Sequence, residues 1–262
     1  AAAGQRAKAH RGARPQPLGP VALELVGAAG AEERARLSPA VLFHAAQQAR
    51  DARRHDQALE LARASQEGFL RRRAAESAAH AYRLEGQTAI QCGRLRDAAA
   101  RGEALLARLP GKARAARGLV ALQLGYLELF LGEPRRSRAI LERGARWLAG
   151  AGPAVERAEL ALARATVEYT EGRWDVYLRD ARRVLPVYRR AGYLGRVETT
   201  LINMAEACTY RGDERERPRH ARGVVAPRRR RARRAPAALE VPRHQHHASR
   251  PATGARQQRT RA

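Results

Sequence analysis

The stretch LINMAEACTYRGD, residues 201–213, carries the pattern that decides how this chain folds, because its small residues recur at fixed distances along the sequence. Its glycine, Gly212, is the last of five turn marks, which are spaced 40, 39, 40 and 40 residues apart. The marks are Arg53, Gly93, Gly132, Gly172 and Gly212, and seven residues before them stand Ala46, Gly86, Gly125, Ala165 and Ala205. This repetition predicts an array of helical hairpins whose backbones approach closely at the small residues.

Apolar residues at the 3.6-residue period place the helices of each unit. They predict hairpins over 39–52 and 55–66, 73–92 and 95–109, 113–131 and 134–149, and 154–171 and 174–191, followed by a first helix at 196–211. The leucines of residues 119–131 cover more than one face, as expected of a helix with neighbours on both sides. We therefore predict an all-α fold, a right-handed α-solenoid of about five antiparallel helix hairpins with 40-residue repeats.

The composition supports thin helical layers in place of one thick core. Aromatic residues make up only 5% of the 262 residues. The sequence contains no apolar run of about 18 residues and no apolar leader, so we expect no membrane contact and no secretory signal. We expect a soluble, cytoplasmic protein. Cys92 and Cys208 lie within predicted helices and are expected to be reduced core residues.

The formal net charge of +25 is unevenly distributed and divides the chain. We predict an irregular leader at 1–37, a helical repeat domain at 38–217 and a disordered Arg/Pro-rich tail at 218–262. The tail has no aromatic residue and cannot bury enough surface to offset its ordering entropy. Arginine dominates the basic residues throughout, and this skew is typical of G+C-rich coding sequence, which weakens charge as a functional signal.

Motifs that carry catalytic chemistry are missing from the sequence. It contains no GxxxxGK[ST] phosphate loop, no GxSxG, no HExxH and no paired CxxC. His244, His246 and His247 are close in sequence, but an Arg-rich tail offers no fixed geometry for a metal. We predict a protein that is not an enzyme and that holds neither a cofactor nor a metal.

The hairpins resemble tetratricopeptide repeats over about residues 38–217. Leu201, Asn203, Ala205, Tyr210 and Gly212 look like the leucine, asparagine, small residue, tyrosine and glycine of that family. The family's small residue early in the second helix is matched by Ala58, Ala98 and Ser137, but the fourth and fifth units have Tyr177 and Arg217 there. The 40-residue unit is longer than usual and is similar to the repeat region of bacterial transcriptional regulators and signalling ATPases of the maltose-regulator type.

Two features of the sequence bear on whether its ends are the natural ends of the protein. Its sole methionine is Met204, and the repeat pattern stops at Arg217 and Pro218. One expectation is a fragment or a changed reading frame near residues 214–218. The other is a genuine basic tail.

The resemblance implies that first helices line a concave groove that binds a protein or peptide. In that register the groove residues are Arg83, Gln87, Tyr126, Phe130, Tyr169 and Tyr210. The competing interpretation is that these aromatic residues only fill interfaces between repeats. Our leading hypothesis is a protein-protein interaction scaffold, part of a bacterial regulatory or signalling protein. The alternative is nonspecific nucleic-acid binding by the tail through Arg228, Arg229, Arg230, Arg231, Arg233 and Arg234.

Overall fold

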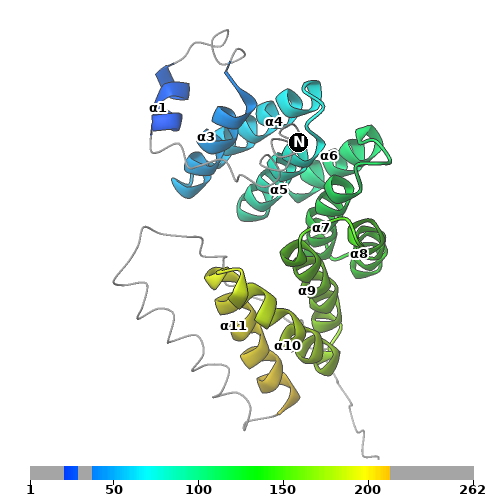
Figure 1. Cartoon of the computed structure of the whole chain (residues 1–262). Coiled ribbons are helices and arrows are strands. Elements are labelled where there is room, and N and C mark those ends of the chain that lie inside the picture. The colour runs from blue at the N-terminus through cyan, green and yellow to red at the C-terminus, as the bar shows by residue number, and fades with distance from the viewer. Residues whose placement is uncertain (1–20, 29–36, 213–262) are drawn as a thin grey trace, which may run out of the picture.

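The computed structural model describes residues 21–28 and 37–212, and the part of the chain so described contains helices and no strand (Figure 1). The helices are α1 (Val21–Ala28), α3 (Pro39–Asp51), α4 (His55–Arg71), α5 (Ala75–Cys92), α6 (Leu95–Arg108), α7 (Arg114–Phe130), α8 (Pro134–Leu148), α9 (Ala154–Thr170), α10 (Trp174–Arg190) and α11 (Leu194–Arg211). They form four hairpins, α3/α4 to α9/α10, and the first helix of a fifth. The predicted all-α solenoid is confirmed.

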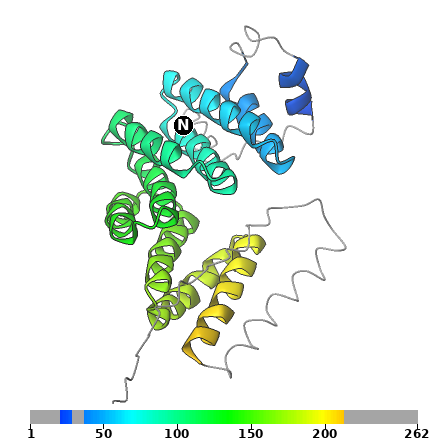
Figure 2. The same ribbon diagram turned by 180° about the vertical axis from the view of Figure 1, so that it is seen from behind.

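The hairpins stack into an arc, which is clear both in Figure 1 and in the reverse view of Figure 2. Second helix α8 lies on the outer side of this arc. At the N-terminal end of the array, α1 packs on α3. There the Leu23 backbone N–H donates to Gln48 Oε1 at 2.8 Å. Ala22 and Val26 of α1 join the buried cluster formed by α3 and α4.

All five predicted turn marks adopt the left-handed conformation, with φ of 59° at Arg53 and 76° to 84° at the four glycines. After the first four marks, the next residue donates its backbone N–H to a carbonyl five residues earlier, as Glu133 does to Glu128 at 2.9 Å. Such a bond satisfies a carbonyl that the helix end would otherwise leave unpaired. The spacing read from the sequence is therefore the spacing of helix ends.

Several helix boundaries differ from the prediction, and two of the helices are longer than expected. Helix α4 runs to Arg71 instead of ending near residue 66, because its last turns pack on the start of α3. Ser65 Oγ donates to the Pro39 carbonyl at 2.7 Å, and a Cβ on Gly68 would lie 2.6 Å from Pro39 Cγ. Helix α11 begins at Leu194 and not at residue 196. Part of the extra length of the repeat thus lies in the helices.

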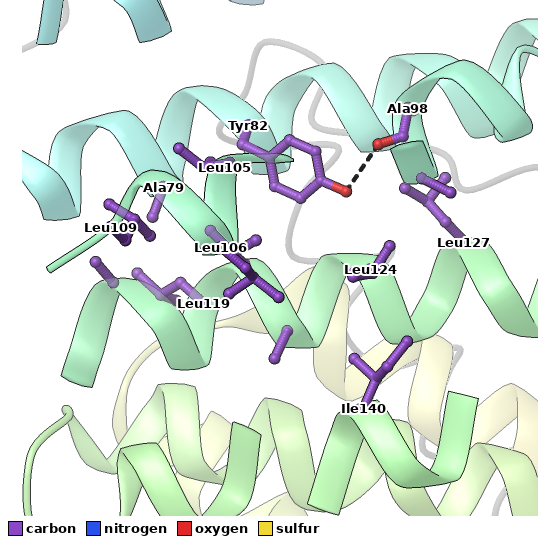
Figure 3. Packing of buried hydrophobic residues seen from close by; sticks show 14 of the residues in the cluster. Ala79, Tyr82, Ala98, Leu105, Leu106, Leu109, Leu119, Leu124, Leu127 and Ile140 are labelled. Atoms are coloured by element: carbon purple, nitrogen blue, oxygen red, sulfur yellow. Dashed lines mark hydrogen bonds between the residues drawn. The ribbon is translucent and has the colours of Figure 1, made fainter. Parts of the chain in front are cut away.

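The small residues lie where helices cross, as the repeat predicted. A Cβ on Gly125 would lie 2.5 Å from Leu141 Cγ, and Ser137 Oγ of α8 donates to the Gly125 carbonyl at 2.8 Å. In the second unit the buried Tyr82 hydroxyl donates to the Ala98 carbonyl at 3.0 Å, among the leucines drawn in Figure 3. Hairpin packing therefore combines close backbone approach with hydrogen bonds to helix carbonyls.

Helix α7 is the most completely covered helix of the array. Leu119, Leu122, Leu124 and Leu127 are at most 1% exposed although they point in different directions around the helix. Its neighbours are α5, α6, α8 and α9. This confirms the expectation that this helix has neighbours on both sides.

The fourth unit replaces the family's small residue with a large one. Tyr177 is fully buried at this position and meets Tyr169 edge to face, with 5.2 Å between the ring centroids. It belongs to a cluster in which α9, α10 and α11 contribute apolar side chains. The last interface is thus built around aromatic rings, whereas earlier ones use alanine and serine.

Candidate partner-binding surface

The predicted groove residues come from the first helices, and contacts between those helices show that they share one surface. Arg50 of α3 donates from Nη1 to Gln87 Oε1 of α5 at 3.0 Å. Tyr169 of α9 donates its hydroxyl to Glu206 Oε2 of α11 at 3.4 Å. These side chains therefore form a strip that runs along successive units.

The middle of the strip contains a bridged ion pair. Arg83 of α5 donates from Nη2 to Glu159 Oε2 of α9 at 2.9 Å, and Arg196 Nε of α11 donates to the other oxygen, Oε1, at 3.1 Å. The Glu159 side chain is 5% exposed. Burial alone would raise the pKa of this carboxyl, but the two guanidinium groups hold it below its ordinary value. Arg83 therefore has a structural partner and is not a free charge awaiting a ligand.

Tyr126 and Phe130 of α7 are half-buried. Tyr126 packs against the cluster shared by α7, α8 and α9. Burial raises the pKa of the Tyr126 phenol, and the nearby Arg196 and Arg83 charges only partly oppose that effect. Tyr126 therefore also fills an interface between repeats.

The C-terminal end of the strip carries the open aromatic surface. Tyr210 of α11 is 58% exposed and stacks on Trp174 of α10, with 5.8 Å between the centroids and 23° between the planes. Tyr169 meets the Tyr210 ring edge to face at 6.3 Å. We call Tyr169, Trp174, Tyr210 and the neighbouring Glu206 the terminal aromatic patch.

Three residues of this surface were missed by the sequence analysis. Trp174 opens a second helix, so a register built on first helices leaves it out. Glu159 and Arg196 lie on first helices, but nothing in the local pattern pairs them across 37 residues. One feature of the sequence could have identified Trp174. It stands two residues after the turn mark Gly172, and a side chain at that position lies near the end of α9.

Several predicted features lie outside the described residues. These include Arg228, Arg229, Arg230, Arg231, Arg233 and Arg234, and the histidines of the tail. Within the described ranges, no group of three or more His, Cys, Asp and Glu residues could hold a metal ion. No helix there is long and apolar enough to cross a membrane.

Comparison with known proteins shows which fold the described helices form. No family model and no curated protein matches the chain. Among solved structures, BtubC from P. vanneervenii superposes with a TM-score of 0.55 at 16% identity, covering 86% of this chain and 94% of its own. The nearly identical TPR-like repeats of a kinesin-light-chain-type protein from Podosopora anserina give a TM-score of 0.54 at 15% identity, over 78% of this chain and 100% of theirs.

The fold is a TPR-like solenoid. This agreement in architecture covers most of the chain. The terminal aromatic patch then spans the second helix of unit four and the first helices of units four and five.

Proposed function

We propose that this protein is a protein-protein interaction scaffold, which binds a peptide or helical segment of its partner along the strip of first-helix residues. The observation that carries the proposal is the terminal aromatic patch. Among the described residues only two large apolar side chains are exposed, Leu194 at 45% and Tyr210 at 58%, and Tyr210 belongs to a continuous set of rings. Exposed clustered aromatic residues are the usual anchors of protein interfaces.

The six groove residues then divide into three roles. Tyr210 is exposed and, with the half-buried Tyr169 beside it, supplies contact area. Arg83 and Gln87 are engaged by Glu159 and Arg50 and hold the first helices in place. Tyr126 and Phe130, also half-buried, form the floor between them. A partner would thus contact the strip mainly at its C-terminal end.

We further propose that the scaffold belongs to a cytoplasmic bacterial regulatory protein and has no catalytic activity of its own. The 40-residue repeat and its resemblance to the repeat region of bacterial regulators support this assignment. The polar side chains of the strip support the second part of this proposal. They pair with each other and are not arranged around a place where a substrate atom could react.

Selection from a random peptide library displayed on phage tests the scaffold function with the full chain as bait. We expect recovered peptides to bind at micromolar concentration and to lose at least tenfold in affinity when Tyr210 is replaced by alanine. Leu194→Ala is the matched control, because it removes the other exposed large apolar side chain of α11, which lies at the opposite end of that helix. Recovery of no peptide, or equal loss in both variants, would argue against the proposal.

A further inference from the structure

Most polar groups of the strip already bind each other. Few of them therefore remain for polar contacts with a ligand. Arg50 pairs with Gln87, and Glu159 holds both Arg83 and Arg196. Glu206 is different. Among the described residues, its contact is the neutral Tyr169 hydroxyl at 3.4 Å, and no arginine or lysine there forms an ion pair with it.

Glu206 and Tyr210 stand one helical turn apart on α11 and therefore lie side by side. Tyr210 is still 58% exposed, although Trp174 stacks on one face of its ring and Tyr169 meets the ring edge to face. An exposed aromatic ring next to a carboxylate is the arrangement that suits a planar cation. The ring attracts the positive charge to its face, and the carboxylate pairs with the edge of the same group.

The neighbouring charges favour a cation at this point even though the whole chain is basic. Arg211 follows Tyr210 directly, but its Nη1 reaches Asp175 Oδ1 of α10 at 2.5 Å. Arg173 is likewise held by Glu168 of α9 and by Glu171, which directly follows that helix. The guanidinium groups closest to the patch in sequence are thus already paired with other carboxylates. The negative charge of Glu206 is not neutralised by any of them.

We propose that Tyr210 and Glu206 form a subsite for an arginine side chain of the bound peptide, whose guanidinium stacks on the exposed part of the Tyr210 ring and pairs with Glu206. This proposal rests on the scaffold function and names the chemistry of the partner. Arginine suits the site better than lysine, because the guanidinium is planar, stacks on rings and is less strongly hydrated than an ammonium. A phosphate or nucleic-acid ligand does not suit it, since Glu206 would repel the anion.

The test uses the full chain and a peptide recovered from the library, in which each arginine is replaced in turn by citrulline, a neutral side chain of the same shape. At one position we expect citrulline to weaken binding about fivefold and lysine to weaken it less, as single exposed cation–π and ion-pair contacts predict. Glu206→Gln should weaken the arginine peptide about as much as citrulline does. It should leave the citrulline peptide unchanged, which identifies the pair directly.

Controls separate the outcomes. Glu142→Gln changes an exposed carboxylate on the outer helix α8 and should have no effect. Peptides that bind well but are indifferent to citrulline and to Glu206→Gln would overturn the subsite and leave the scaffold function standing. Recovery of no peptide would remove both.

The chain's own arginines are a further possible occupant. A full-length variant with glutamine at Arg228–Arg231, Arg233 and Arg234 tests this. Equal affinity of this variant and the original chain for the arginine peptide supports an external ligand. An increase of more than tenfold in the variant would mean that the chain itself occupies the site, and would overturn the proposal.

Discussion

Arg83 and Glu159 form an ion pair between units that are not neighbours in the array. Their atoms Nη2 and Oε2 lie 2.9 Å apart, although α5 belongs to the second unit and α9 to the fourth. In a simple solenoid each repeat contacts only the next one, and stability is a sum of unit and nearest-neighbour terms. This pair adds a contact across α7 on the inner side of the arc. It should therefore resist any opening of the arc.

Replacing Glu159 with glutamine should destabilise the protein by about 3 kcal/mol, the usual result of removing one partner of a buried ion pair. Arg83 and Arg196 would remain close together without the charge that neutralises them. Denaturation in urea measures the change in the free energy of unfolding. Glu171→Gln, which affects an ion pair nearer the surface, is the control and should cost no more than about 1 kcal/mol. Equal losses of stability in the two variants would show that the Arg83–Glu159–Arg196 bridge contributes no more than a surface ion pair.

The same bridge should give the stability a defined pH dependence. The folded pKa of Glu159 lies below its ordinary value of 4.5, so its contribution is complete above that value and is lost as the pH falls through the folded pKa. The stability difference between the original chain and Glu159→Gln should therefore be constant near neutral pH and shrink below about pH 4.5. A difference that grows on acidification would contradict the assignment. Urea denaturation at a series of pH values is the measurement.

Two buried tyrosines should respond in opposite ways to loss of the hydroxyl. Tyr82→Phe removes a hydrogen bond to Ala98 and should cost about 1 kcal/mol. The Tyr188 hydroxyl is buried with no hydrogen-bond partner among the described residues, so Tyr188→Phe should be neutral or stabilising. Thermal denaturation of both variants checks this. A clear loss in Tyr188→Phe would reveal a partner such as an ordered water.

Gly125→Ala should destabilise by about 1–3 kcal/mol, because the added methyl group would overpack against Leu141 where α7 and α8 cross. The control is Gly111→Ala. Gly111 lies in a connector, has no atom within 4 Å of the added carbon, and does not need a left-handed backbone. Circular dichroism during heating should show a lower midpoint for the first variant only. Similar midpoints for the two variants would refute close packing at Gly125.

Arg53→Gly should stabilise the first hairpin. Arginine at φ 59° carries a left-handed penalty of about 1–2 kcal/mol, which exceeds the entropic cost of about 0.5–1 kcal/mol that glycine brings. Arg54→Gly is the neighbouring control, because its φ is −85° and glycine there brings only the cost. Opposite shifts in the denaturation midpoint are expected. A fall in both would mean that the Arg53 side chain contributes more than its backbone costs.

Local pattern predicted the units of this fold well. The five turn marks were readable because a left-handed residue must end each first helix, and glycine fills four of the five places. Packing between helices was harder to predict from the local pattern. The extension of α4 to Arg71 depends on its contact with Pro39, which lies 26 residues before Ser65 in the sequence.

The binding surface was predicted only in part, for a related reason. The first-helix register found Tyr169 and Tyr210, which do meet. It could not show that Arg83 is held by a residue 76 positions away, because that contact depends on how strongly the arc bends. Trp174 was missed because it reaches the surface from a second helix. Curvature and cross-unit contacts are properties of the assembled array and are absent from any one repeat.

The glycine contacts between units make the interfaces differ from one another. A Cβ on Gly86 of α5 would lie 2.5 Å from Gln123 of α7, and on Gly102 of α6 it would lie 3.3 Å from Leu124 of α7. A Cβ on Gly144 of α8 would lie 3.1 Å from Leu160 of α9. Each notch in a helix accepts one particular side chain. Nearly identical repeats are prone to pair out of register during folding, or with the wrong copy of the chain. Here a hairpin shifted by one unit would bring the wrong side chain to each notch, so the order of the units is encoded in their shapes.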